Sequence, residues 1–422
     1  MDKNTIKLVV IEQRKNFEKK VEIISRNVPR GFSDSRKISV ISGIRRSGKS
    51  TLLKQISRNF DNFYYFNFED ERLLDFQAKD LNTLYEVLLE LYGEQKVFFF
   101  DEIQNVYGWE KFARRLFEDG KKIFITGSNA KLLSSELATT LSGRHLKMEL
   151  YPFSFAEFLE AEKFLVKDFY DTQEKSILVR KFNHYLEYGG FPEIVISKNK
   201  KELQQLYQDI LIKDLIVRFK IRETKTFREI ALYFLSNVTA PMSFNNVRKM
   251  VGVKSVMTVK NYVDFFEEAY LFFSLFKFDY SIKKQIINNR KVYAVDTGLA
   301  NAVAFKFSEN IGANLENLIF IELKRRDAEV FYFKDKKECD FVIRKGLKIT
   351  EAIQVTRSLA DPKTAEREIA GLLSAMEKFK LKTGLIITES QEDERTIDGL
   401  PAGQAGKKIK IVPAWKWLLK RL

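Results

Sequence analysis

Short apolar runs alternate with stretches of helical periodicity over the first 150 residues. The runs, rich in β-branched and aromatic residues, are Lys37–Ile41, Asn62–Phe68, Val97–Phe100 and Lys121–Thr126. Between them apolar residues recur every three or four positions, as in Leu52, Leu53 and Ile56, which is the spacing of an amphipathic helix. Continuously apolar strands are buried on both faces, so this alternation predicts a parallel, three-layer α/β domain over residues 1–150.

Helical patterns flank this domain on both sides. Residues 5–28 have the spacing of a helix with a polar face, followed by a turn at Pro29-Arg30-Gly31. Residues 151–222 are typical of a helical segment, with helices expected over 153–164, 177–188 and 201–219. The run Gly189-Gly190-Phe191-Pro192 should separate the last two of these helices.

Residues 223–300 have the pattern of a winged helix-turn-helix. A helix from Phe227 to Leu235 precedes a short helix over 243–251, a turn at Gly252 and a second helix from Ser255. Two candidate wing strands, 271–278 and 290–295, bracket the basic pair Lys283-Lys284. Lys254, Thr258 and Lys260 near the start of the second helix suit a DNA groove and its phosphates. Winged helices also bind proteins, so both kinds of partner remain open.

One stretch between a strand and a helix, Gly43-Ile-Arg-Arg-Ser-Gly-Lys-Ser-Thr51, fits the phosphate-binding pattern G-x-x-x-x-G-K-[ST]. Gly43 and Gly48 allow the amide groups of the loop to turn towards phosphates, and the helix start adds its positive dipole end. Lys49 would contact the β- and γ-phosphate oxygens. The Ser50 hydroxyl would complete a Mg²⁺ shell. Ser47 and Thr51 complete the predicted nucleotide-binding set, and ATP with Mg²⁺ is the expected ligand.

Two carboxylates end the apolar run 97–100. Ligands of doubly wound sheets bind at the carboxyl ends of the strands. Asp101 is therefore placed to hold Mg²⁺ through water, and Glu102 to orient or deprotonate the attacking water. The next strand ends at Gly127-Ser128-Asn129, where Ser128 or Asn129 could contact the γ-phosphate or that water. Capping a helix that begins near Lys131 is an equally good role for this turn.

The composition favours an intracellular protein with an anionic partner. The 422 residues carry 72 Lys and Arg against 57 Asp and Glu, a net charge of +15 that favours nucleic acid. A single cysteine, Cys339, excludes an intrachain disulfide, in agreement with a reducing cytosol, and only two histidines argue against a His-based metal site. No apolar run reaches the roughly 18 residues that cross a bilayer, and no signal sequence is visible, so we expect a cytoplasmic protein with no membrane partner.

Taken together, the motifs resemble a prokaryotic AAA-type ATPase family whose members join the ATPase to a C-terminal domain of unknown function with a restriction-endonuclease-like fold. The matching segments are 43–51, FDEIQ at 100–104, ITGSN at 125–129, LSGR at 141–144, YPFSFAEF at 151–158, YGGFPE at 188–193, YAVDTGL at 293–299 and ECDF at 338–341. The resemblance implies a helical lid over residues 151–222 that moves with the nucleotide state. It also implies a role for Arg144, which could reach the γ-phosphate of its own or a neighbouring subunit's nucleotide, although a surface arginine is equally consistent. A homo-oligomer would allow Arg144 to contact the nucleotide of a neighbouring subunit.

Residues 301–422 follow the element order of the PD-(D/E)XK nuclease fold, to which this segment is similar. A helix over 310–326 precedes strands at 330–333, 338–343, 350–356 and 384–388. Glu316 and Asp340 match the acidic positions of active members. The last position reads Gln354-Val-Thr356, where an active site would have Glu-x-Lys, although Arg357 could substitute for the missing lysine. Losing a ligand charge and the lysine predicts a weak or inactive nuclease.

Three hypotheses follow for the function. The first is a Mg²⁺-dependent ATPase that couples its nucleotide state to the engagement of DNA. The second makes residues 301–422 a DNA-cutting module gated by ATP. The third is a signalling switch that binds proteins and no nucleic acid, for which DNA affinity would be absent or would not fall steeply with salt. The sequence does not separate the first from the third.

Overall fold

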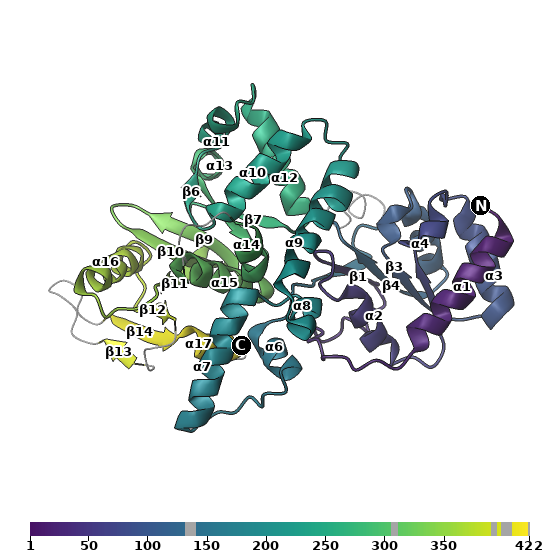
Figure 1. The fold of residues 1–422 in the computed structure, drawn as a ribbon, viewed down its shortest axis with the longest axis horizontal. Coiled ribbons are helices and arrows are strands. Elements are labelled where there is room, and N and C mark those ends of the chain that lie inside the picture. Colours follow the sequence, from purple (N-terminus) through teal and green to yellow (C-terminus); the bar gives the residue numbers. More distant parts are fainter. Residues whose placement is uncertain (131–140, 305–310, 390–394, 398–406, 421–422) are drawn as a thin grey trace. The chain divides into compact units, whose positions relative to one another are not determined.

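The computed structural model describes residues 1–130, 141–304, 311–389, 395–397 and 407–420 (Figure 1). These residues form two compact units. Unit 1 comprises Met1–Tyr151 together with Glu268–Tyr270, and unit 2 comprises Pro152–Glu267 with Leu271–Leu422. Among the described helices, none combines the length and apolar character that spanning a bilayer requires.

Unit 1 is built on the parallel sheet expected from the alternating pattern. Its strands are β1 (Ile38–Ser42), β2 (Tyr64–Asn67), β3 (Val97–Asp101), β4 (Lys122–Gly127) and β5 (His145–Glu149), in the order β2-β3-β4-β1-β5 and parallel throughout. Both faces are buried: Phe98 and Phe100 belong to one apolar cluster and Phe99 to the other. The prediction that the phenylalanine run is a buried strand is confirmed.

In the described part of unit 1, four helices cover the two faces of this sheet. They are α1 (Lys3–Glu18), α2 (Lys49–Ser57), α3 (Asp80–Tyr92) and α4 (Trp109–Glu118), with short 3₁₀ turns at Glu71–Leu73 and Ile103–Asn105. Leu52, Leu53 and Ile56 of α2 pack with Phe99, whereas α1, α3 and α4 contribute to the cluster around Phe98 and Phe100. The helical period of α2 is thereby confirmed.

The N-terminal helix is shorter than its pattern indicated, since α1 ends at Glu18 where a helix over 5–28 was expected. The reason is tertiary. The backbone N–H of Arg26 donates to the Gln55 side chain at 2.8 Å, and the Gln55 amide donates back to the Arg26 carbonyl at 2.9 Å. These bonds fix an extended segment against α2. The helix proposed near Lys131 falls on residues 131–140, outside the described residues.

Unit 2 begins with helices, as its pattern predicted. They are α6 (Phe155–Ala161), α7 (Thr172–Tyr188), α8 (Pro192–Ser197) and α9 (Lys200–Asp209), followed by a π-helical turn at Ile210–Val217. The helix expected over 201–219 is thus present without a break, but its second part is π-helical and not α-helical. Ser154 and Asp171 begin α6 and α7 with capping boxes that the sequence carries locally.

Helices α10 (Thr224–Ser236), α11 (Phe244–Val251) and α12 (Val256–Glu268) come next along the chain. They accompany a small antiparallel sheet of β6 (Pro241–Met242), β7 (Phe272–Phe276) and β8 (Arg290–Ala294), in the order β6-β8-β7. Gly252 ends α11 with φ 73°, the left-handed conformation that glycine adopts without strain. The segment between β7 and β8 contains a short exposed helix, α13 (Ile282–Ile287), which includes Lys283 and Lys284.

The last part of unit 2 has a sheet between two helices. Helix α14 (Thr297–Val303) leads to α15 (Ile311–Arg325), then β9 (Glu329–Lys334), β10 (Glu338–Lys345), β11 (Lys348–Val355), α16 (Pro362–Lys378), β12 (Thr383–Thr388), β13 (Arg395–Ile397), β14 (Lys408–Pro413) and α17 (Ala414–Leu419). The sheet order is β13-β14-β12-β11-β10-β9. On β10, Phe341 lies near Phe320 of α15, whereas Val342 packs in the cluster with Leu372 of α16. The two helices therefore cover opposite faces.

Two glycine-containing motifs separated by about a hundred residues interlock within unit 2. The buried Asp296 carboxylate accepts hydrogen bonds from the Gly190 N–H at 2.7 Å and the Leu299 N–H at 2.9 Å. A Cβ on Gly298 would lie 1.9 Å from the carbonyl oxygen of Tyr188, and one on Gly189 would lie 2.0 Å from Asp296. Close packing therefore explains the glycines at Gly189 and Gly298, and the hydrogen bonds explain Asp296.

Candidate nucleotide site and C-terminal pocket

The phosphate loop follows β1 and leads into α2. Gly48 has φ 97° and ψ 24°, a conformation that side chains disfavour. A Cβ on Gly43 would lie 2.1 Å from the Leu150 carbonyl oxygen, so only glycine fits there. The Ser47 hydroxyl is buried and has no hydrogen-bond partner among the described residues. A buried donor left unpaired in a loop of this shape fits a phosphate oxygen as its partner.

The side chains of Lys49 and Glu102 contact each other. The Lys49 ammonium lies 3.1 Å from Oε1 of Glu102 and donates to the Gly43 and Ile44 carbonyls at 3.2 and 3.3 Å. The Gln104 amide donates to the other carboxylate oxygen of Glu102 at 2.5 Å. Burial acts to raise the pKa of Glu102, but Lys49 and Gln104 lower it overall, so this carboxylate stays ionised.

Asp101 is fully buried at the end of β3 and is surrounded by hydroxyl groups. Ser50 and Thr126 both hydrogen-bond to its carboxylate, and the Tyr65 hydroxyl donates to Oδ2 at 3.2 Å. Burial and the neighbouring Glu102 charge raise the pKa of Asp101. A carboxylate and a serine hydroxyl side by side are hard oxygen ligands of the kind that Mg²⁺ prefers, so this pair fits the expected ion. Thr126 was not among the residues selected from sequence.

Thr51 and Ser128 were also predicted as residues of the nucleotide site. Ser50 and Thr51 line a cavity of about 520 Å³ together with residues of α1 and the β2 end. Ser128 follows β4, is buried, and accepts a hydrogen bond from Gln104 at 3.3 Å. Since Gln104 also donates to Glu102, one amide links Ser128 to that carboxylate.

Arg144 lies beside the beginning of β1, whereas the phosphate loop follows the end of that strand. Its carbonyl accepts from the Ile38 N–H at 2.9 Å, and Ile38 is the first residue of β1, whereas the loop follows the last residue, Ser42. Five strand residues span about 16 Å. The Arg144 guanidinium lies 3.6 Å from Glu118. The structure therefore does not bring Arg144 to the nucleotide loop of its own chain, and contact with a neighbouring subunit's nucleotide stays a prediction.

Tyr270 is a residue of this unit that sequence reasoning missed. Its hydroxyl is 2.6 Å from the Ser42 hydroxyl, directly before the phosphate loop, and it donates to Glu149 at 3.5 Å. The side chain is buried and its backbone φ is 58°. Because Tyr270 is 228 positions from Ser42 along the chain, no local pattern could have signalled the contact.

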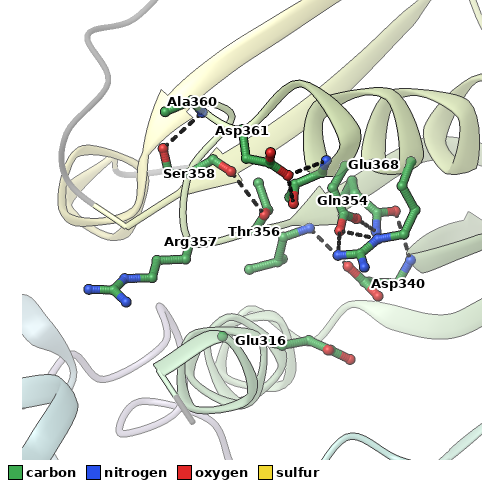
Figure 2. Close-up of a pocket in the computed structure, with 13 residues that line it drawn as sticks. Glu316, Asp340, Gln354, Thr356, Arg357, Ser358, Ala360, Asp361 and Glu368 are labelled. Carbon is green, nitrogen blue, oxygen red and sulfur yellow. Dashed lines mark hydrogen bonds and ion pairs between the residues drawn. The ribbon is translucent and has the colours of Figure 1, made fainter. Parts of the chain in front are cut away.

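The three residues of the suspected nuclease site come together in unit 2. Glu316 of α15, Asp340 of β10 and Gln354 of β11 line one pocket of about 640 Å³, with Thr356 and Arg357 on its wall (Figure 2). Figure 2 shows Glu316 extending from its helix towards Asp340, whereas Arg357 points away from them. Arg357 is largely exposed and pairs with Glu389 at 3.1 Å. The arginine therefore does not stand in for the missing lysine in this structure.

The amide of Gln354 is engaged on both sides. Its oxygen accepts from the backbone N–H of Asp340 at 3.3 Å, and its nitrogen donates to the buried carboxylate of Glu368 on α16 at 2.6 Å. A glutamate at position 354 would face Glu368 as a second buried negative charge. Among the residues that the structure describes, no group of three or more His, Cys, Asp and Glu side chains is arranged to hold a metal ion. The pocket thus does not fit the catalytic metal that a nuclease would need.

The five-stranded parallel sheet, its phosphate loop and the two carboxylates ending β3 define unit 1 as an AAA-type P-loop ATPase domain, and hence a nucleotide-binding one. In agreement, residues 35–159 match the protein family described as an AAA domain, and residues 179–310 match one described as a domain of unknown function (DUF8612).

Two relatives place the whole chain in one family. It is 39% identical over 434 residues to an uncharacterised protein of Methanocaldococcus jannaschii, covering 99% of this chain and 96% of the relative. It is 34% identical over 411 residues to an uncharacterised protein of Haemophilus influenzae, covering 92% of this chain and 96% of that one. The chain belongs to the family that these proteins represent. Among solved structures it is similar to a Walker-type ATPase of Pyrococcus abyssi, 15% identical with a TM-score of 0.43, covering 68% of this chain and 99% of the other.

Proposed function

We propose that this protein binds ATP with Mg²⁺, hydrolyses it, and uses the nucleotide state to control the engagement of DNA by residues 223–300. The observation that carries the nucleotide half is the position of Lys49, Ser50, Asp101 and Glu102 within one hydrogen-bonded group at the end of the sheet. A Lys49→Ala protein should lose ATP hydrolysis. Hydrolysis at the parent rate in that variant would refute the proposal.

Each residue has a defined part in this reaction. The amides between Gly43 and Thr51 would surround the β- and γ-phosphates, with the Ser47 hydroxyl as an additional donor. Ser50 and Asp101 would hold Mg²⁺, which supplies positive charge to the phosphate oxygens. A γ-phosphate at the loop would draw Lys49 away from Glu102, which leaves that carboxylate free to orient the attacking water. Ser128 would contact this water or the γ-phosphate.

The case for DNA rests on cations without acidic partners. We infer a winged helix-turn-helix here because the element order and the β6-β8-β7 sheet fit that pattern, in which α12 would be the recognition helix and α13 would lie within the wing. The basic side chains of α11, of the turn after it, of α12 and of α13 are Arg248, Lys249, Lys254, Lys260, Lys283 and Lys284. None of them forms an ion pair with a described residue, whereas many surface cations elsewhere in the chain are paired. Unpaired cations on one module suit a polyanionic partner.

A salt titration of DNA binding tests this half of the proposal. The logarithm of the affinity should fall with the logarithm of salt concentration, by about 0.9 for each phosphate neutralised. The double variant Lys254→Ala/Lys260→Ala should weaken binding and reduce the slope by about 2. The matched control Lys167→Ala/Lys345→Ala removes the same charge from lysines paired with Glu174 and Glu351, and should change little. Measuring the DNA affinity with and without ATP tests whether the nucleotide state controls DNA binding.

Two parts of the proposal require more than one chain or conformation. Arg144 would act on the nucleotide of a neighbouring subunit, so we expect a homo-oligomer, and Arg144→Ala should then slow hydrolysis in the assembled protein only. A rate of ATP hydrolysis that does not depend on protein concentration or on Arg144 would count against the oligomer. The second part is a change of conformation, in which residues 151–222 would act as the lid over the nucleotide.

The two alternatives are outcomes of the same experiments. No DNA affinity, or affinity that is insensitive to salt, would favour the switch that binds proteins. An ATP-gated nuclease would nick plasmid DNA with Mg²⁺ or Mn²⁺, and Asp340→Ala would abolish the nicking. We expect no nicking, because the Gln354 amide is engaged with Glu368 and Thr356 offers no cationic group.

A further inference from the structure

The phosphate loop carries a second paired cation besides Lys49. Arg45 occupies an unspecified position of the loop pattern, four residues before Lys49, so the pattern assigns it no role. Its side chain is 20% exposed, and one guanidinium nitrogen lies 2.6 Å from Oε1 of Glu69. Glu69 is 44% exposed, so water reaches this ion pair more easily than it reaches the buried pair of Lys49 and Glu102.

Glu69 holds the Arg45 guanidinium at the carboxyl end of the sheet. Asn67, the last residue of β2, is in register with Asp101 of β3, and the backbone N–H of Glu69 donates to the Asn67 side chain at 2.8 Å. Glu69 also lines the cavity of about 520 Å³ that includes Ser50. The guanidinium is therefore held at the end of the sheet where nucleotide phosphates are expected.

The charge of Arg45 acts on the carboxylate that we propose orients the water. Burial raises the pKa of Glu102, whereas the Lys49 charge and, more weakly, the Arg45 charge lower it. Interactions between charges are largely screened by salt beyond about 10 Å unless the groups are buried. Arg45 and Glu102 therefore belong to one electrostatic site.

Each of these two loop cations is paired with an acid that follows a neighbouring strand. Lys49 pairs with Glu102 after β3, and Arg45 pairs with Glu69 after β2. A γ-phosphate carries more negative charge than one carboxylate, and a guanidinium can donate to two of its oxygens at once. Exposed ion pairs contribute little to stability, so phosphate oxygens should displace Glu69 from the guanidinium.

We propose that Arg45 is a catalytic residue whose guanidinium leaves Glu69 when ATP binds, contacts the γ-phosphate and stabilises the charge that develops there during hydrolysis. This inference rests on the proposed ATPase activity. In that reaction water forms a bond to the γ-phosphorus as the bond to the oxygen that leaves with ADP breaks, and a water proton is released to solvent. Arg45 exchanges no proton, since arginine stays protonated in proteins. It would act within one chain, whereas Arg144 requires a neighbouring subunit.

Equilibrium binding of ATP and of ADP, together with single-turnover hydrolysis, tests the proposal. Arg45→Gln should lower the ATP affinity about tenfold and leave the ADP affinity unchanged, because ADP has no γ-phosphate. It should slow hydrolysis about 10³-fold at every protein concentration. Arg45→Lys keeps the charge but loses the forked geometry, so its ATP affinity should lie between those of the parent and Arg45→Gln. An unchanged ADP affinity also shows that the loop of each variant is intact.

Removing the acid separates this role from that of a merely structural ion pair. Glu69→Gln should raise the ATP affinity relative to that for ADP about 2- to 5-fold, because Glu69 no longer competes for the guanidinium. In an Arg45→Gln background the same exchange should leave this ratio unchanged, whereas a general loss of negative charge would act in both backgrounds. If the ion pair only braced the loop, Arg45→Gln and Glu69→Gln would change the ATP affinity in the same direction, which would overturn the inference.

Arg114→Gln is a matched control for the loss of an arginine. Arg114 pairs with Glu118 on α4 at 2.9 Å, and both side chains are about half exposed. Glu118 also lies beside Arg144, near the beginning of β1, so this pair is at the opposite end of that strand from the loop. Both affinities and the rate of hydrolysis should match those of the parent in this variant.

The same measurements distinguish failure of this inference from failure of the proposed function. Arg45→Gln might be compared with a parent protein that hydrolyses ATP and is inactivated by Lys49→Ala. A parental rate and a parental ratio of ATP to ADP affinity in Arg45→Gln would then overturn the role of Arg45 and leave the ATPase standing. A parent protein that binds no ATP would overturn both.

Discussion

Replacing Glu102 by glutamine should separate nucleotide binding from hydrolysis. The variant keeps the shape of the side chain but removes the charge that lies 3.1 Å from the Lys49 ammonium, with both side chains at most 10% exposed. A hydrogen bond to a charged group is worth about 1.5–3 kcal/mol. In the proposed mechanism ATP breaks this pair, so Glu102→Gln should bind ATP roughly 10- to 100-fold more tightly. Loss of the carboxylate that we propose orients the water should slow hydrolysis by about 10²–10⁴-fold.

Two measurements check this prediction. Fluorescent ATP binding at equilibrium gives the change in Kd, and phosphate release under single-turnover conditions gives the change in rate. Glu94→Gln is a suitable control, because it removes a carboxylate that pairs with Lys121 at 2.7 Å far from the phosphate loop and is largely exposed. Both quantities should stay near the parent values in this control. Weaker ATP binding by Glu102→Gln, or an unchanged rate, would refute the reasoning.

Three further predictions concern stability. Burial raises the pKa of Asp296 to about 6 from an ordinary value of 3.8, so the folded chain binds this proton more tightly than the unfolded one. The free energy of unfolding of the parent, measured relative to Asp296→Asn by denaturant titration, should therefore rise as the pH is lowered through 6. Gly298→Ala should destabilise unit 2 by about 3 kcal/mol, because its Cβ would overlap the Tyr188 carbonyl oxygen, and a thermal midpoint equal to the parent's would contradict this. Tyr270→Phe removes the hydroxyl that contacts Ser42 and should cost about 1 kcal/mol in the same denaturant titration.

The parts of the fold that could be predicted are those with a local cause. A strand that is apolar at every position, as in Phe98-Phe99-Phe100, can only be stable with both faces covered, and the structure covers both. The end of α1 could not be predicted in the same way. Residues 19–28 have helical spacing, but the hydrogen bonds between Arg26 and Gln55 favour an extended segment.

The residues of the nucleotide site also fall into those that the sequence could predict and those that it could not. Gly43, Gly48 and Lys49 were identifiable because a phosphate loop is one continuous stretch, and Asp101 because it ends the neighbouring strand. Thr126 and Tyr270 contact this site through partners 25 and 228 positions away, which no local pattern reveals. Gln104 lies only 2 positions from Glu102, but the sequence did not indicate that its amide would hold that carboxylate. The distance of Arg144 from the loop follows from strand register, which the spacing of residues does not reveal.

The sequence by itself determined that this chain has a phosphate loop on a parallel sheet. The glycine conformations, the burial of the strands and the order of the elements all depend on residues that are close together in the sequence. Only the tertiary structure decided what surrounds Asp340. The sequence predicted Glu316 and Asp340 as the acids of a nuclease-like site, but strand β8 places the Lys291 ammonium 3.0 and 3.4 Å from them. Charges interact through space and not along the chain, so the state of a buried acid is settled by whichever cation the fold places beside it.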